Sequence, residues 1–443
     1  MLDKKYYVYG ANIFHQLTKI GDTEVFRVCA NYGFQTLLAT NYKICDVGDK
    51  FYSFLIDGLK NGDQNTIVES IKYLISLDNS ISNDDLLLFS KQLIKESLCG
   101  DDQPVLMFAT NTIRKHYNHA NENFAALFNN IYFVEKINAP LSINNYYIDF
   151  DYDDNHERGV DIELVPYPIN NNIKLENDGR KVYFNERKKD DYDDIFVHRI
   201  NDLIISETTS YPKIIVTPEI VGNEYIDEAI KSIADETNNT TCIVCPSYHH
   251  IKNGKRYNSS LVITNENRTN KKKRLYKYRG MDTRKDELLE DIDSDSGINL
   301  IVINIIGFGR IVFVICRDFL TNDYRNIIRT ICPEIVIIQT YTKEFSEFIN
   351  KSVEYANDRC EIFMINACNA VQGLSECNYV FLEIGRANKR NANVLKNKYE
   401  CNLCKEKCNQ IDRCEFHVKV RMMNACEGKL ELNIQTEEIK NGK

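Results

Sequence analysis

The chain has 443 residues and a formal net charge of −9. This length exceeds the usual size of a single hydrophobic core, so it predicts two domains. The acidic balance argues against a protein whose whole surface coats nucleic acid or an anionic membrane. No apolar run approaches the ~20 residues that span a bilayer. The first residues also lack the apolar segment of a signal peptide, so we expect a cytoplasmic protein without membrane contact.

The first part of the chain, residues 1–143, has a mainly helical pattern. Apolar residues recur at helical spacing in 65–75 and again in 82–94, where Ser82 or Asn83 would cap the helix. The apolar run 104–109 fits either a buried strand or a helix, because periodicity alone does not separate the two. The pattern indicates no function for this domain.

Residues 144–158 are acidic and aromatic, a composition typical of an exposed connector, and we place the domain boundary there. The aspartates between 149 and 154 alternate with Phe150 and Tyr152. A strand with one wet face explains this alternation better than a metal site does.

Residues 159–400 predict an α/β domain, because apolar strand-like runs alternate with amphipathic helices. The strands are expected near 160–165, 213–217, 241–245, 260–264, 300–304, 310–315 and 334–339, and the helices near 192–206, 226–236 and 322–330. The polar stretch 170–192 has the composition of a surface insertion.

Two reactive side chains stand at the ends of apolar strands in this domain. Glu219 follows the run 214–217 and a proline, and Cys316 ends the run 311–315. A thiol becomes a good nucleophile when a neighbouring base removes its proton, and Glu219 could be that base. The alternative for Cys316 is an inert core thiol, and for Glu219 a surface carboxylate.

A tetrahedral intermediate carries negative charge, which a fixed ammonium stabilises. Lys277 is the candidate, because strand alternation would place it on the same face as Leu275. Four other basic residues crowd the segment 271–274, so a solvated charged face is the alternative.

The segments PEIV (218–221), RLYKYRG (274–280) and VICRDFL (314–320) resemble, in order, the three signature segments of the nitrilase (carbon-nitrogen hydrolase) superfamily. The resemblance covers roughly 159–385 and implies an α-β-β-α sandwich that pairs into homo-oligomers. It also implies Glu219, Lys277 and Cys316 as the catalytic triad, and a second glutamate beside the lysine, for which we name Glu287, with Glu290 as the other candidate. The positions implied for substrate binding are Tyr257, Arg317, Asp318 and Asn366. The chain departs from the family after Asn366, where a glycine-rich hairpin is usual, and this puts the substrate pocket in doubt.

The C-terminal segment, 401–443, is rich in cysteine and ends in strand-like runs. Cys401, Cys404, Cys408 and Cys414 are spaced compactly enough for a structural zinc site, with reduced loop cysteines or a redox-labile pair as alternatives. The segment has a local excess of basic residues, so contact with nucleic acid or a protein is a further hypothesis, for this tail as for the N-terminal domain.

Two functions follow from these observations. The first is hydrolysis of a non-peptide carbon-nitrogen bond, in an amide or nitrile, through a thioester on Cys316 and without a cofactor. The second is a nitrilase-like binding or regulatory module, such as an effector in a bacterial defence system, because a fold does not guarantee activity.

Overall fold

A computed structural model describes residues 4–80, 105–109, 127–150, 158–384, 396–399, 416–424 and 430–438, with short breaks at 41, 129, 136–139, 207–209, 238–241, 267–268, 281, 284–287, 307, 358–359 and 372–380. The chain divides into two compact units. The smaller contains Met1–Asn138 and Asn326–Pro333, and the larger contains Ala139–Arg325 and Glu334–Lys443. None of the helices in the described ranges is long and apolar enough to cross a membrane.

Helices make up most of the described part of the smaller unit. They enclose an apolar core that includes Leu17, Leu55 and Ile71. The last helix is capped by Asp63, whose carboxylate accepts a hydrogen bond from the Thr66 N–H at 2.9 Å. The elements are α1 (Lys4–Ile20), α2 (Asp22–Tyr32), α3 (Phe34–Leu38), a 3₁₀ turn (Ile44–Asp46), α4 (Asp49–Lys60) and α5 (Gln64–Asn79), followed by the antiparallel pair β1 (Val105–Ala109) and β2 (Ile131–Glu135).

The run 65–75 is therefore helical, and 105–109 is the strand of its two alternatives. The second predicted helix, 82–94, lies outside the described residues.

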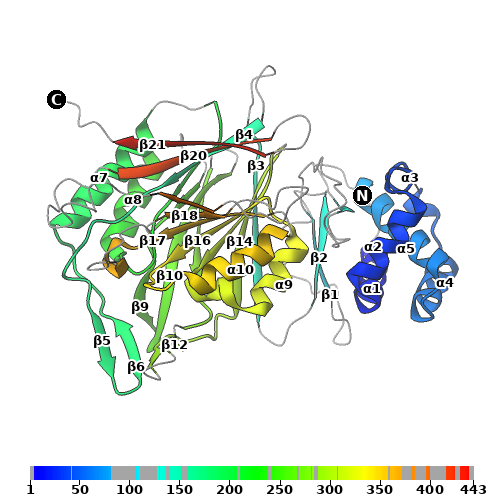
Figure 1. The fold of residues 1–443 in the computed structure, drawn as a ribbon, viewed down its shortest axis with the longest axis horizontal. Helices are drawn as coiled ribbons and strands as arrows, with labels where there is room; N and C mark the ends of the chain where they lie inside the picture. The colour runs from blue at the N-terminus through cyan, green and yellow to red at the C-terminus, as the bar shows by residue number, and fades with distance from the viewer. Residues whose placement is uncertain are drawn as a thin grey trace. The chain divides into compact units, whose positions relative to one another are not determined.

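The larger unit is a mixed α/β domain built on two large sheets (Figure 1). The sheet that carries Glu219, here called the glutamate sheet, has the order β11-β10-β8-β7-β4-β20-β21, with β9 paired to β10. Its strands are β4 (Arg158–Leu164), β7 (Lys213–Val216), β8 (Cys242–Val244), β9 (Tyr248–Lys252), β10 (Lys255–Glu266), β11 (Thr269–Tyr276), β20 (Phe416–Asn424) and β21 (Leu430–Glu438).

The second large sheet carries Cys316 and is here called the cysteine sheet. Its order is β19-β18-β17-β16-β15-β14-β3. The strands are β3 (Leu141–Ile148), β14 (Ile298–Ile305), β15 (Gly309–Ile315), β16 (Ile335–Thr340), β17 (Glu361–Asn366), β18 (Phe381–Ile384) and β19 (Lys396–Tyr399). Every residue of β14, β15, β16 and β17 is buried, as expected for strands covered on both faces.

The two large sheets pack against each other through β10 and β11 on one side and β3, β14 and β15 on the other. The helices α7 (Asp191–Ile205) and α8 (Glu224–Glu236) cover the outer face of the glutamate sheet with Phe196, Ile200 and Ile230. On the other side, α10 (Ser346–Asn357) packs against β17 and β18 of the cysteine sheet. Gln339 joins the sheets, because its Nε2 donates to the carbonyls of Thr217 at 2.6 Å and Cys245 at 2.9 Å.

The remaining elements are short. A small four-stranded sheet contains β5 (Leu175–Asp178), β6 (Lys181–Phe184), β12 (Asp282–Thr283) and β13 (Leu288–Glu290), in the order β12-β13-β6-β5. A 3₁₀ turn (Cys316–Leu320) and helix α9 (Asn322–Ile331) follow β15, and another 3₁₀ turn (Cys368–Val371) follows β17.

Two boundary predictions need correction. Residues 144–148, predicted as the start of a connector, form the second half of β3, which pairs in parallel with β14. The two asparagines that resemble loop residues lie in this strand, where Oδ1 of Asn145 accepts a hydrogen bond from Asn304 on β14. The compact units also divide earlier, between Asn138 and Ala139. Residues 151–157 lie outside the described residues.

The docking of β3 can be tested at Gly297, which has φ 65° and precedes β14. A Cβ at Gly297 would lie 2.0 Å from the carbonyl oxygen of Pro140, whereas Gly254, with φ 76°, has open space around it. Gly254→Ala should therefore cost only the left-handed backbone penalty of roughly 1–2 kcal/mol. Gly297→Ala should cost about 1–3 kcal/mol more, because the new methyl group overlaps the backbone.

Urea unfolding followed by tyrosine fluorescence measures both losses, since the chain has no tryptophan. Equal losses in the two variants would show that β3 does not pack tightly against the turn at Gly297.

Candidate active site

A buried lysine shared by two carboxylates forms the centre of the site. Lys277 Nζ lies 2.7 Å from Oε1 of Glu219 and 2.6 Å from Oε2 of Glu290. The three residues are 3%, 1% and 8% exposed, respectively. Charged groups are almost never this buried unless they are paired. The structure thus brings Glu219 and Lys277 together, as the sequence predicts.

Glu219 stands just beyond β7, at a sharply turned backbone. The next residue, Ile220, has φ 72°, a conformation that is a genuine outlier for a β-branched residue. Ser247 holds the turn: its Oγ accepts the Ile220 N–H at 3.1 Å and its carbonyl accepts the Gly222 N–H at 3.1 Å. Strain of this kind persists where the surrounding structure enforces it, often at functional sites.

Cys316 is also in a left-handed conformation, with φ 45°, at the junction between β15 and the 3₁₀ turn. Its thiol is buried close enough to the Glu219 carboxylate for that charge to raise the pKa of the thiol, and the Tyr341 backbone lies near the same sulfur. Among the described residues, no group hydrogen-bonds to Oε2 of Glu219. The nucleophile and base predicted from two separate strand ends thus meet across the two large sheets.

The second glutamate is Glu290, at the end of β13. Glu287 lies outside the described residues, so its own position is not part of this geometry. Glu290 binds Lys277 directly, and its other oxygen, Oε1, faces Asn258 Nδ2 at 3.1 Å and His249 Nε2 at 2.9 Å. Of the two candidates, Glu290 is shown to pair with the lysine, and Glu287 stays a prediction.

Asn258 and His249 complete the cluster, and neither was predicted from the sequence. They lie directly opposite each other on β10 and β9, and Lys277 continues the row beyond the end of β11, where its N–H donates to the Asn258 carbonyl at 2.9 Å. Asn258 Nδ2 also donates to Oε1 of Glu219 at 3.0 Å. A single cross-strand row thus presents His249, Asn258 and Lys277 to the two glutamates.

Tyr257, predicted to bind substrate, lies on the other face of β10. Its ring contacts those of His250 and Tyr276, which are the chain neighbours of His249 and Lys277. Successive side chains of a strand point to opposite faces, so placing Asn258 in the cluster turns Tyr257 away from it. The residue of this strand that reaches the cluster is Asn258, which follows the tyrosine in the sequence.

The other predicted substrate contacts hold the backbone of the site. Asp318 accepts the N–H groups of Tyr278 at 2.9 Å and Arg279 at 2.6 Å, which ties the turn after Cys316 to the residues after Lys277. Asn366 is fully buried and exchanges two hydrogen bonds with the backbone of Thr342, at 2.8 and 2.9 Å. Arg317 is half-buried next to the nucleophile.

The stretch 170–192, predicted as a surface insertion, contributes to the site through the hairpin of β5 and β6. Val182 and Phe184 of β6 are buried, and β6 pairs in parallel with β13, the strand that ends at Glu290. The Phe184 N–H donates to His249 Nδ1 at 3.1 Å, and its ring meets that of Tyr341 edge to face at 5.0 Å. The stretch is therefore a structural part of the site as well as a polar surface element.

The two glutamates differ in their proton affinity. Burial would raise the pKa of Glu290, but Lys277 and His249 outweigh it and hold that pKa well below the ordinary value. For Glu219, burial dominates, and together with the charge of Glu290 it raises the pKa despite Lys277. Burial and Glu219 also raise the pKa of the Cys316 thiol. Glu290 is thus the permanent anion, and Glu219 is the group suited to accept a proton.

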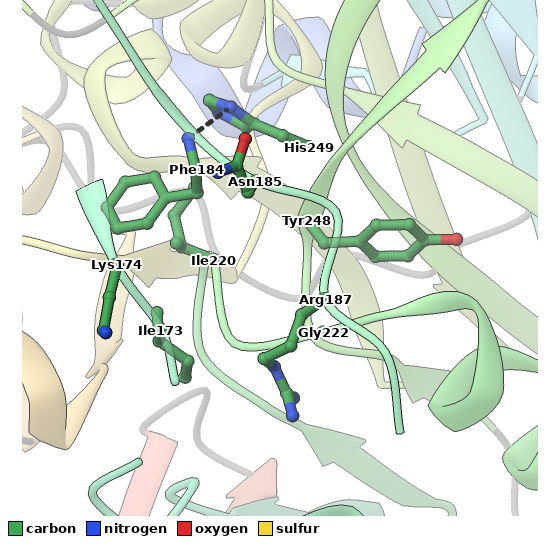
Figure 2. Close-up of a pocket in the computed structure, with 9 residues that line it drawn as sticks. All are labelled: Ile173, Lys174, Phe184, Asn185, Arg187, Ile220, Gly222, Tyr248 and His249. Atoms are coloured by element: carbon green, nitrogen blue, oxygen red, sulfur yellow. Dashed lines mark hydrogen bonds between the residues drawn. The ribbon is translucent and has the colours of Figure 1, made fainter. Parts of the chain in front are cut away.

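A pocket with an empty volume of ≈ 270 Å³ lies beside this cluster (Figure 2). Ile220, which follows Glu219, and His249, which contacts Glu290, both line it. Phe184 and Ile173 add apolar surface, and Lys174 is exposed to solvent. Asn185, Arg187 and Tyr248 complete the lining, so the wall of this pocket is more polar than apolar.

The predicted zinc ligands Cys401, Cys404, Cys408 and Cys414 lie outside the described residues. Within the described ranges, no group of three or more histidine, cysteine, aspartate or glutamate side chains is arranged to hold a metal ion. The zinc site remains a prediction.

Comparison with solved structures identifies proteins of similar architecture. The glutamine-dependent NAD⁺ synthetase of Acinetobacter baumannii matches at a TM-score of 0.38 and 11% identity, over 65% of this chain and 48% of that chain. A mutant of the Nesterenkonia AN1 amidase from the nitrilase superfamily matches at a TM-score of 0.35 and 11% identity, over 64% of this chain and 92% of that chain. Another structure of an amidase from Nesterenkonia sp. matches at a TM-score of 0.34 and 13% identity, over 64% of this chain and 92% of that chain.

The match spans about half the length of the synthetase. The solved structures include amidases of the nitrilase superfamily, the family that the three sequence segments resemble. No protein-family model and no curated protein matches the sequence. At this level of similarity, the argument for function rests on the side chains of the site.

The pKa of Asp318 gives a test of the hydrogen bonds by which this carboxylate joins the turn after Cys316 to the residues after Lys277. Burial raises this pKa from 3.8 to about 7, against the opposing effect of the two backbone N–H groups. The folded state therefore binds a proton that the unfolded state releases between about pH 4 and pH 7, and wild-type stability should fall with rising pH in that window. Asp318→Asn is neutral throughout, so its stability relative to wild type should improve as pH rises from 4 to 7.

Urea unfolding at several pH values measures this difference. Asp323→Asn is the control, because that side chain is half-exposed and should leave the pH dependence unchanged. A constant difference between wild type and Asp318→Asn would contradict a raised pKa at Asp318.

Proposed function

We propose that this protein hydrolyses a non-peptide carbon-nitrogen bond of an amide, with Cys316 as nucleophile, Glu219 as general base and Lys277 as the electrostatic partner of the oxyanion. One observation carries the proposal: the buried Glu219 carboxylate pairs with the Lys277 ammonium at 2.7 Å and lies near enough to the buried Cys316 thiol to raise the pKa of that thiol. A candidate nucleophile, base and cation gathered in one buried cluster are what covalent acyl transfer requires.

The first half of the reaction forms a thioester. Glu219 takes the thiol proton while Cys316 Sγ attacks the carbonyl carbon, so the carbonyl oxygen gains the negative charge. Lys277 stabilises that charge in a site with little water, where electrostatic interactions are strong. The carbon-nitrogen bond then breaks, and protonated Glu219 returns the proton to the leaving amine or ammonia.

The second half of the reaction releases the acid. Glu219, again ionised, takes a proton from a water molecule as that water attacks the thioester carbon, and the thiolate leaves and recovers the proton. The sum is amide plus water giving carboxylic acid plus amine or ammonia. The scheme uses only this chain's side chains and water.

The raised pKa values of Glu219 and Cys316 support this order of events. Because burial raises the pKa of Cys316, the resting thiol keeps its proton, and the attack needs a base in contact. Because the pKa of Glu219 is also raised, this carboxylate holds the abstracted proton more readily than an ordinary glutamate does. We propose that the pocket next to Ile220 and His249 receives part of the substrate.

The proposal is tested by the rate at which iodoacetamide alkylates Cys316 at neutral pH and by release of ammonia from a panel of simple amides. Wild type should be labelled at Cys316 before the other buried cysteines of the described ranges. Glu219→Gln should slow labelling and turnover by about 10²-fold or more, the range of general-base catalysis. Cys316→Ala should abolish both.

Glu224→Gln is the matched control, because Glu224 is an exposed carboxylate five positions along the chain and should leave both rates unchanged. Intact-mass spectrometry of wild type with amide should show an acyl adduct on Cys316 that disappears with time. Labelling that does not depend on Glu219, without ammonia release from any amide, would refute the hydrolase and favour a binding or regulatory module.

A further inference from the structure

We propose that His249 is a positioning residue, held as the neutral tautomer with its proton on Nε2, which donates to Glu290 and keeps that carboxylate ionised and directed at Lys277. The inference rests on the proposed function for its kinetic consequences and on geometry for the tautomer. It assigns a role to the hairpin of β5 and β6 that the catalytic scheme does not use.

Hydrogen bonds on both nitrogens define the tautomer. The Phe184 backbone N–H points at His249 Nδ1 at 3.1 Å, as the dashed line in Figure 2 shows. A backbone N–H only donates, so Nδ1 must accept and carries no proton. The proton of a neutral imidazole then lies on Nε2, which is 2.9 Å from Oε1 of Glu290. The side chain is only 2% exposed, so water does not replace either partner.

The same geometry disfavours the imidazolium form. A proton on Nδ1 would point one N–H donor at another, the backbone N–H of Phe184, and so break the hydrogen bond between them. The charged groups of the cluster are Glu290 and Glu219 with Lys277 between them. In the wall of the neighbouring pocket, Lys174 is exposed and Arg187 is paired with Asp190 and Asp193. The Phe184 N–H is therefore the group that fixes the form of the ring, because it requires an unprotonated Nδ1.

The hairpin holds Glu290 by its backbone as well as through His249. The N–H groups of Leu289 and Asp291, on either side of Glu290, donate to the carbonyls of Arg180 at 2.8 Å and Val182 at 2.7 Å. The next alternate residue of β6 is Phe184, whose N–H holds His249. One strand of the insertion therefore positions both the main chain of Glu290 and the donor that orients its side chain.

This arrangement divides the two oxygens of Glu290 between separate partners. Oε1 is occupied by His249 and Asn258, which leaves Oε2 directed at Lys277 at 2.6 Å. Without the His249 donor, the buried carboxylate loses a hydrogen bond that favours its charged form, and its hold on Lys277 weakens. Lys277 would then pair more strongly with Glu219 and reduce the ability of Glu219 to take the thiol proton.

Two amide substitutions separate the roles of the two nitrogens. In His249→Gln, the amide nitrogen is as many bonds from Cβ as Nε2 is, so it can still donate to Glu290. In His249→Asn, the amide oxygen matches Nδ1 and can accept from Phe184, but no donor reaches Glu290. We expect His249→Asn to lower kcat by about 10- to 100-fold, the effect of losing a hydrogen bond to a charged group. KM should stay near the wild-type value, and His249→Gln should restore most of kcat.

His250→Asn is the matched control, because His250 is the chain neighbour of His249 and its ring contacts that of Tyr257 on the other face of the strands. The kcat of His250→Asn should equal that of wild type. Nitrogen-15 NMR of histidine-labelled wild type, compared with His249→Asn to identify the signal, reports the tautomer directly. The expected spectrum at neutral pH is that of a neutral ring protonated on Nε2.

An Nδ1-protonated or charged ring at neutral pH would overturn the proposal. A wild-type kcat in His249→Asn would also overturn it. An equal loss of kcat in both amide variants would overturn it as well, because it would indicate that His249 acts by packing alone. If wild type hydrolyses no amide, the proposed function fails but the spectrum still decides the tautomer. The rate of Cys316 alkylation then takes the place of kcat as the measured quantity. Alkylation should be fast in wild type and His249→Gln and slow in His249→Asn.

Discussion

Lys277 is almost completely buried and lies between two carboxylates, so three formal charges occupy a region from which water is largely excluded. Removing a charge from water costs several kcal/mol, and the cost is recovered only when geometry and additional hydrogen bonds are nearly complete. Asn258, which donates to both glutamates, and His249, which contacts one, supply part of this hydrogen bonding. The proposed roles of the other residues in the site depend on this charge balance.

The balance gives the glutamates different tasks. If a single carboxylate faced Lys277, the ammonium would hold it ionised and make it a poor base. With Glu290 as the firmly ionised partner, the positive charge is already matched, and burial can raise the pKa of Glu219. Pairs of titratable groups whose environments separate their pKa values are a recurring way to divide acid and base roles. Here burial and the charge of Glu290 raise the pKa of Glu219, whereas Lys277 and then His249 lower that of Glu290, and His249 contacts only Glu290.

The sequence predicts the parts of this arrangement that depend on single strands. Glu219 and Cys316 end apolar runs, and Lys277 follows the alternation that buries Leu275, so local patterns locate all three. Glu290 was one of two candidates, and Asn258 and His249 were not predicted, because the positions of all three depend on which strands are neighbours and in what register. The placement of Tyr257 away from the cluster has the same origin: the two faces of β10 differ by one residue, and only the position of β9 and β11 shows which face meets the glutamates. Residues 144–148 were misjudged because Asn304, the partner of Asn145, is 159 positions away.

The cost of the site bears on the choice between an enzyme and a binding module. Ile220 and Cys316 both hold left-handed backbone conformations, each costing of order 1–3 kcal/mol, and they flank the point where base and nucleophile meet. Buried ion pairs are often no more stabilising than apolar packing of the same volume, so the charges add little to the stability of the fold. Strained backbone and buried charge gathered around one thiol and one carboxylate therefore favour the proposed hydrolase over a binding module. In that proposal, proton transfer from the thiol requires the two groups to be held within reach while water is kept away.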